Sequence, residues 1–542
     1  MLPHGLTLLA QNRLPACSEC ARWKLHCVYA TPRTADLPMQ DTESLGQLPR
    51  NSDPMQSMVQ YSLLDGVNID LDSPPSLFGS LTPCSGQLDP SILSMSLTPP
   101  STTSLPESLP SFTQVMEIVQ LFFQHNHKLL PCIHQESFVN ILIDIQAAAD
   151  TPLLWSILAV VGQTSKGMQY PHEKWHDVAI RLYEQSVRSN GPVLRDAQAA
   201  VWNACYDYIQ GDLLQATSRL AQGFSVACMH GLNRIDDDYK PLHLILPLNS
   251  AVEEEECRWT MWAFYLLDRQ VNYLHGVHFA VNDRIFMVEY PCSSLSESSE
   301  RIGQYPRSNR QIFTRDLASL SYPPLADQPF ELSIHQFTQK AFVLLGRIVE
   351  YQNMVTPDTD HQQRADEFLQ LKAALVKTWV TVTHSLSMNA VGTDSFAITR
   401  LHVTLHTCSV ILDYPTSACA KNVKVSSIFV RGAGGVTFLR AFKAIQSMID
   451  VIKERATAAE SPFMGSFLAP SYFLACRFLS ARWRHSQEEV HRRSLFLLMG
   501  LLEQLSDSGV VFAQRLRDMV FFDLQSGDID NINLVHGSWN QK

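Results

Sequence analysis

The 542-residue sequence contains no apolar run long enough to cross a bilayer, which requires about 20 consecutive apolar residues. The longest such run, residues 152–162, is about half that length. Residues 1–13 have no basic start before a short apolar run, which argues against a secretory signal. Charged residues make up only 18% of the chain, and the net charge of −11 argues against nonspecific attraction of the whole chain to nucleic acid. We therefore expect an intracellular protein with no membrane partner, in which any contact with DNA is local.

The sequence motifs of several common enzyme classes are also missing. The chain has no G-x-S-x-G, no H-E-x-x-H and no phosphate-binding P-loop. Residues 424–442 come nearest to a phosphate loop, but Thr437 stands in the place of the third glycine and there is no Walker lysine. These absences predict that the protein is not an enzyme. In a reducing compartment its 12 cysteines are expected to be buried thiols or metal ligands.

What the chain does have near its N-terminus is a C-x2-C-x6-C pattern, made by Cys17, Cys20 and Cys27. Thiolates are preferred ligands of tetrahedral zinc, and a C-x2-C pair is its usual local chelating unit. Three thiolates leave a tetrahedral site one ligand short, so we expect an incomplete zinc site in residues 1–34. Arg22 and Lys24 make the segment basic, which suits a remnant of a DNA-binding module. A basic tail with chance cysteines is the alternative.

Residues 35–111 are rich in Pro, Ser, Thr, Leu and Asp and contain no Trp. Too little aromatic and branched surface is present to offset the entropy of ordering, so we predict a disordered linker. Its prolines interrupt any heptad repeat, which leaves a coiled-coil dimer without support. Residues 62–81 alternate acidic and apolar side chains, a composition that fits either an activation segment or a plain linker.

The most organised stretch of the chain runs from Glu253 to Pro291. The glutamates at its start suit the first turn of a helix, where free N–H groups and the positive end of the dipole favour carboxylates. Trp259, Trp262 and Leu266 then follow at spacings of three and four, which predicts a helix with one apolar face. Periodicity alone predicts plain core packing for this helix.

Two features upstream of this stretch also bear on the fold. Residues 196–209 and 213–229 predict a helical hairpin that is closed by Gly231, and the small residues of 221–234 would let two helices approach closely. One group of residues could be interpreted as a metal site: His125, His127, Cys132 and His134. No acidic residue or second spaced cluster completes that site, so a structural role is favoured.

The stretch from Glu253 to Pro291 resembles the central signature of the fungal-specific transcription factor domain. The residues that carry the resemblance are Glu256, Arg258, Trp262, Tyr265, Leu267, Asp268, Arg269, Gly276, Asp283, Pro291 and Cys292. The chain departs from the family at Val277 and His278, where the family commonly has Arg-Pro after the glycine. A second set of residues resembles the opening of the same domain: Phe122, Phe123, Pro131, His134 and Phe138. The resemblance is nearly continuous over residues 112–295.

This resemblance implies an all-helical regulatory domain, a nuclear location and regulation of RNA polymerase II transcription. It also implies that Cys17, Cys20 and Cys27 are half of a fungal binuclear zinc cluster, with Arg22 and Lys24 as DNA-binding residues. Because one half is absent, either the chain begins downstream of it or the cluster has been lost. The implied partners are double-stranded DNA if the cluster is completed, transcriptional coregulators, a small-molecule effector and a second copy of the chain without an evident coiled coil. A relative that does not bind DNA and acts through protein partners is the alternative.

Beyond this domain, Ser, Arg and Pro predict a surface loop over residues 296–330, followed by a helical region, 331–542, that continues the same body. The helices expected there are Ile334–Gln352, Gln362–His384, Thr399–Leu412, Val436–Thr457, Pro470–Trp483 and His485–Leu505. Helix after helix without strand alternation predicts an all-α fold, a helical array.

Overall fold

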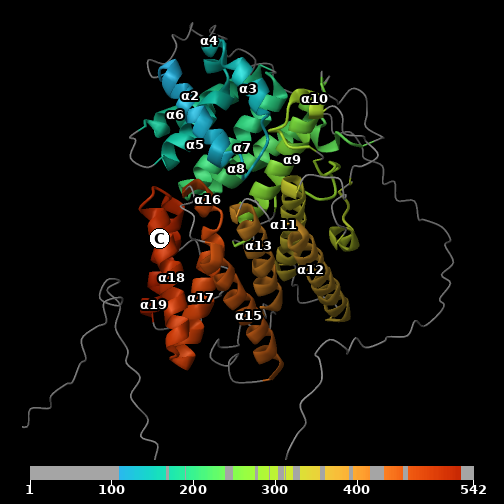
Figure 1. The fold of residues 1–542 in the computed structure, drawn as a ribbon, viewed down its shortest axis with the longest axis vertical. Helices are drawn as coiled ribbons and strands as arrows, with labels where there is room; N and C mark the ends of the chain where they lie inside the picture. The colour runs from blue at the N-terminus through green and yellow to red at the C-terminus, as the bar shows by residue number, and fades with distance from the viewer. Residues whose placement is uncertain are drawn as a thin grey trace, which may run out of the picture. The chain divides into compact units, whose positions relative to one another are not determined.

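The computed structural model describes residues 109–526, with gaps at 166–169, 190, 238–247, 249, 275–278, 292, 303–310, 312, 322–329, 354–360, 390–394, 415–431 and 456–461 (Figure 1). All of the described residues belong to one compact unit. They contain helices and no β-strand, which confirms the all-α prediction. Within this described part, no helix is long and apolar enough to cross a membrane.

The N-terminal half of the described chain is a succession of mostly short helices. They are α2 (Phe112–Leu121), the π-helical turn η2 (Phe122–Asn126), α3 (Gln135–Ile141), α4 (Ile145–Ala149), α5 (Pro152–Thr164), α6 (His172–Arg188), α7 (Val193–Ile209), α8 (Leu213–Met229), η3 (Leu232–Arg234), α9 (Ala251–Asn272) and α10 (Ser299–Ile302). The predicted hairpin is α7 and α8. Gly211, at φ 74°, makes the turn between them, and Gly231, at φ 79°, follows α8.

The C-terminal half is built from longer helices, several of which run side by side in Figure 1. They are η6 (Leu317–Ser321), α11 (Phe330–Asn353), α12 (His361–Asn389), α13 (Ser395–Asp413), α15 (Gly432–Arg455), α16 (Pro462–Ser466), α17 (Ala469–Ser486), α18 (Glu489–Ser506) and α19 (Val511–Ser526). Each helix predicted beyond residue 331 is present. The sequence did not predict α19, whose Phe512, Leu516 and Val520 are buried in the core.

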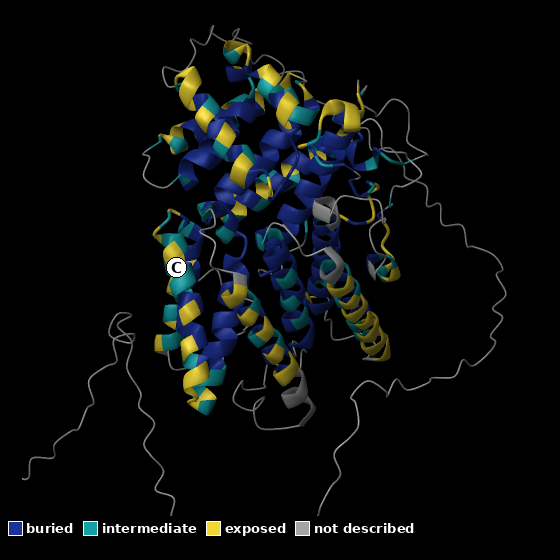
Figure 2. Ribbon diagram, in the orientation of Figure 1, coloured by how far each residue is buried: buried dark blue, intermediate teal, exposed yellow. Residues whose placement is uncertain are grey.

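Helix α9 lies in the middle of the core, and almost its whole length is buried (Figures 1 and 2). It begins at Ala251 because the Ser250 hydroxyl accepts a hydrogen bond from the backbone N–H of Glu253, at 3.2 Å. The predicted apolar face is confirmed, since Trp259, Trp262 and Leu266 are all buried. Burial does not stop at that face, however, and also takes in charged side chains.

The small residues of α8 allow the close helix packing that the sequence predicts. Gly223 faces α7 and α9, and a Cβ atom placed there would come within 2.6 Å of the Ala200 Cβ and 3.0 Å of the Phe264 ring. Any side chain at this position would therefore push α8 away from both neighbours.

Hydrogen bonds join the N-terminal helices to the C-terminal ones through the core. The Tyr208 hydroxyl on α7 donates to the carbonyl of Ser466, at 3.0 Å, and accepts from the amide of Gln270, at 3.2 Å. The same Gln270 amide donates to the carbonyl of Phe467, at 2.9 Å. The helices α7 and α9 are thus tied directly to the α16–α17 region.

Candidate functional site

A buried group of four charged residues and one tyrosine, here called the α9 ion network, is centred on the C-terminal half of α9. It consists of Asp268, Arg269, Asp283, Tyr265 and Arg347. The Arg269 guanidinium donates to Asp268 and to Asp283, each at 2.7 Å, and to the carbonyl of Val281, also at 2.7 Å. The Tyr265 hydroxyl donates to the same Asp283 oxygen at 2.9 Å. The network therefore fastens the chain after α9 back onto the helix.

Asp268 completes this fastening by accepting from the backbone of the returning segment. Its carboxylate oxygens accept from the N–H groups of Ala280 and Val281, each at 3.0 Å, and from the Asn272 amide at 3.0 Å. A buried carboxylate with this many donors is fully satisfied, which is the condition for an ion pair to be tolerated inside a protein.

The Arg269 side chain is held as a cation despite complete burial. Burial lowers the pKa of its guanidinium, but the Tyr265 ring and the carboxylates of Asp268 and Asp283 outweigh burial and raise it. The guanidinium also stacks on the Tyr265 ring, 3.9 Å from its centroid. Gly346 of α11 makes room for it, because a Cβ there would lie 3.0 Å from the Arg269 Nε.

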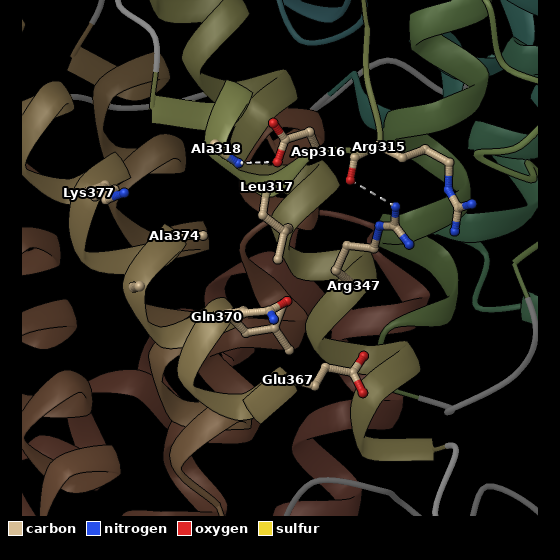
Figure 3. Close-up of a pocket in the computed structure, with 11 residues that line it drawn as sticks. Arg315, Asp316, Leu317, Ala318, Arg347, Glu367, Gln370, Ala374 and Lys377 are labelled. Atoms are coloured by element: carbon tan, nitrogen blue, oxygen red, sulfur yellow. Dashed lines mark hydrogen bonds between the residues drawn. The ribbon is translucent and has the colours of Figure 1, made fainter. Parts of the chain in front are cut away.

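A pocket of about 600 Å³ lies beside this network, between η6, α11 and α12 (Figure 3). Three of its lining side chains are cationic, Arg315, Arg347 and Lys377, and two are acidic, Asp316 and Glu367. In Figure 3, Lys377 lies on the opposite side of the pocket from the two arginines. The surplus of positive charge suits an anionic group.

Arg347 belongs both to the pocket wall and to the α9 ion network. Its Nε lies 3.2 Å from Asp283, an ion pair without the alignment of a hydrogen bond. Its Nη2 donates to the carbonyl of Arg315 at 3.3 Å, and its Nη1 lies 3.8 Å from Glu350. None of these contacts is short, so an anion in the pocket could compete for Arg347. Arg347 therefore provides a direct link from the pocket to α9.

Two further ion clusters hold the first half of α9 in place. Arg258 donates to Asp236 at 2.7 Å and to Glu255 at 3.0 Å. Glu256 pairs with Arg195 at 2.8 Å and accepts from the backbone N–H of His134, also at 2.8 Å. Two signature residues, Glu256 and Arg258, are thus buried charges that find partners outside α9, at Arg195, His134 and Asp236.

The structure does not describe the N-terminal residues singled out by the sequence. Cys17, Cys20 and Cys27, with Arg22 and Lys24, lie outside the described residues, as do residues 35–108 of the linker and the segment Gly276-Val277-His278. The zinc and DNA-binding assignments therefore stay predictions.

Two of the histidines near η2, His127 and His134, make hydrogen bonds within the fold. The His127 Nε2 accepts from the N–H of Ile133 at 3.2 Å, and the His134 ring contacts the Ser137 hydroxyl at 2.7 Å. Burial raises the pKa of the Cys132 thiol. In the chain as described, no three His, Cys, Asp or Glu side chains are placed to share a metal ion.

Sequence reasoning found the α9 residues but not the pocket. Asp283 belongs to the quoted signature, whereas Arg315, Arg347 and Lys377 carried no signal. They come from three separate parts of the chain, and no spacing rule relates a helix to residues about 30 positions away.

Residues 119–385 match the family described as the fungal specific transcription factor domain, and this range includes α9, its ion network and the pocket walls. A segment of 187 residues is 24% identical to the pigment biosynthesis transcriptional activator pigB of Monascus ruber, covering 33% of this chain. It covers 34% of the length of that activator. No solved structure matches the chain. Residues 119–385 of this protein are thus a fungal specific transcription factor domain.

Proposed function

We propose that the protein is a regulator of RNA polymerase II transcription in the nucleus of a fungus, and not an enzyme. The observation that carries the proposal is the family match over residues 119–385. Within that range, the charged signature residues Asp268, Arg269 and Asp283 bind one another in the buried α9 ion network. The likeness to a transcriptional activator supports it. Transcriptional coregulators are the partners that this function requires.

The regulatory role is placed in the helical body, with the pocket of η6, α11 and α12 as the effector site. An anionic effector would pair with Arg347 and Lys377 and draw Arg347 away from Asp283. A ligand shifts a conformational equilibrium only by binding the two states unequally, and competition for one guanidinium supplies that difference.

Two routes to DNA are compatible with the sequence. In the first, Arg22 and Lys24 contact DNA through a segment organised by Cys17, Cys20 and Cys27. Three thiolates do not complete a tetrahedral zinc site, so this segment alone does not fit the metal. In the second, the helical body reaches its target gene through a protein partner.

The regulatory proposal predicts an effect on a reporter gene. The full chain, fused to a bacterial repressor's DNA-binding domain and expressed in a fungal host, should change reporter output several-fold relative to that domain alone. Arg347→Gln should shift this output, because it removes the cation shared by the pocket and the network. Arg188→Gln, which alters an exposed pair with Glu184, is the matched control and should have no effect. Output equal to that of the DNA-binding domain alone would contradict the proposal.

The two routes to DNA are separated by zinc content and by salt dependence. We expect the ratio of tightly bound zinc ions to purified chains to be below about one, because the site lacks one ligand. Its binding to duplex DNA should then weaken only slightly with salt, since each neutralised phosphate contributes about −0.9 to the log–log slope. Full zinc loading with a steep slope would establish the first route and reject the partner-mediated one.

A further inference from the structure

Helix α12 carries large apolar side chains on its outer face as well as on its buried one. Leu369, Val376 and Val380 are 63%, 52% and 64% exposed. Leu375 and Val382, on the other side of the helix, are buried, and α12 packs against α11, α13 and η6. Figure 2 shows the outer side of α12 as a run of exposed residues. A surface helix normally has polar side chains on its solvated face, so a second apolar face suits a partner.

The exposed apolar residues of α12 have the spacing of a coiled-coil seam. Steps of three and four residues alternate along a set here called the α12 stripe: Asp366, Leu369, Ala373, Val376, Val380 and Thr383. All of its members are exposed. This alternation brings them to one side of the helix, where a second helix can lie along them.

The α12 stripe is complementary to itself when two copies of it run antiparallel, with the two-fold axis between Ala373 and Val376. Leu369 of one copy then faces Val380 of the second copy, and Ala373 faces Val376. The four central layers are wholly apolar in this arrangement. Each of the two outer layers pairs the Asp366 carboxylate with the Thr383 hydroxyl, which can donate a hydrogen bond to it. An apolar centre with polar ends is the usual composition of an interface.

Polar residues in and beside the stripe favour the antiparallel arrangement over the parallel one. Gln370 and Lys377 border the stripe on one side. Antiparallel copies bring Gln370 of one opposite Lys377 of the other, where the amide oxygen can accept from the ammonium group. A parallel pair would instead place Asp366 against Asp366, and like charges in contact are unfavourable. Antiparallel helices also set opposite ends of their dipoles side by side.

We propose that the α12 stripe is a dimer interface, at which α12 of a second copy of this chain packs antiparallel. Identical patches that meet about a two-fold axis satisfy each other, so assembly stops at the dimer. The stripe is about 25 Å long, and one helix pair of this length buries less area than a standard interface. The dimer is therefore expected to be reversible, with a Kd on the order of micromolar. Ala373 also lines the pocket of η6, α11 and α12, so the second copy lies along the edge of that pocket.

Analytical ultracentrifugation of the purified full chain measures this association. From about 1 to about 50 µM, the average mass should rise from that of one chain toward that of two. A double variant, Leu369→Lys with Val380→Lys, places two ammonium groups opposite each other in each of two layers and should weaken the dimer at least tenfold. Its helix content by circular dichroism should not change, because both side chains are exposed. Phe522→Lys is the matched control, since Phe522 is 61% exposed on α19 and lies outside the stripe.

Disulfide crosslinking tests the direction of the two helices. A mixture of the Leu369→Cys chain and the Val380→Cys chain, one of them tagged, should give a crosslinked pair of unequal chains. Each variant alone should crosslink no more than the original chain. The two Leu369 positions of an antiparallel pair are about 16 Å apart along the helix, and a disulfide requires Cα atoms within about 7 Å.

Each outcome decides the proposal. A chain that stays monomeric at about 50 µM, or a double lysine variant that associates as the original chain does, overturns it. Crosslinking of Leu369→Cys with itself shows a parallel pair and also overturns it. If the chain is monomeric and the double variant lowers the reporter output, the stripe binds a different protein and not a second copy. Association is measured on isolated protein, so its failure would leave the transcriptional proposal standing.

Discussion

Replacing Asp268 by alanine is expected to lower the free energy of unfolding by about 3–5 kcal/mol, the usual cost of removing one partner from a buried ion pair. Asp268 is 0% exposed. Without its carboxylate, Arg269 loses one partner and the N–H groups of Ala280 and Val281 lose their acceptors. Of the contacts that join residues 280–283 to the Asp268–Arg269 pair, only those of Asp283 and the Val281 carbonyl with Arg269 would then remain.

Urea unfolding of the full chain, followed by circular dichroism at 222 nm for helix content, measures this loss. The matched control is Glu184→Gln, which breaks an ion pair with Arg188 whose side chains are 53% and 81% exposed. Surface pairs of this kind contribute less than about 1 kcal/mol. If Asp268→Ala cost no more than the control, the α9 ion network would not be a structural element of the domain.

The second large effect is expected at Gly223, where alanine should destabilise the protein by about 1–3 kcal/mol. The added methyl group would lie 2.6 Å from the Ala200 Cβ and 3.0 Å from the Phe264 ring. Both neighbours are part of packed helices, so relief requires α8 to move away from α7 and α9. Valine at the same position should cost more, because it adds two further carbon atoms.

Gly500 provides a control at which a glycine-to-alanine change is expected to raise the stability of the same protein. It lies inside α18, and a Cβ atom there would meet nothing within 4 Å. Gly500→Ala should therefore stabilise the chain by up to about 1 kcal/mol, since alanine is the better helix former. Thermal melts of both variants check the pair. A gain in stability for Gly223→Ala would show that α8 is not held against α7 as described.

The sequence predicted the helices well because each apolar stripe reflects a local rule. The spacing of Trp259, Trp262 and Leu266 is enough to predict α9 and its buried face. The same rule places charged side chains on a solvated face, and this is where it fails for α9. Glu256 and Arg258 are buried because their partners come from loops and helices distant in the sequence.

The pocket of η6, α11 and α12 could not be predicted for a similar reason. One wall comes from residues 315–318, inside the segment predicted to be a surface loop, where Phe313 and Leu320 are buried. The other walls come from α11 and α12. Only the folded chain brings these charges together, whereas a motif such as C-x2-C is visible because its residues are close in sequence.

The hydroxyl of Tyr208, shared between Gln270 and the carbonyl of Ser466, has a practical consequence for anyone who expresses pieces of this protein. A fragment that ends with the family match, at residue 385, would lack the carbonyl groups that the Tyr208 hydroxyl and the Gln270 amide bind. It would also expose the apolar core surface that the later helices cover. Such a fragment should aggregate, and expression plasmids should encode the chain through α19 so that this core surface stays covered.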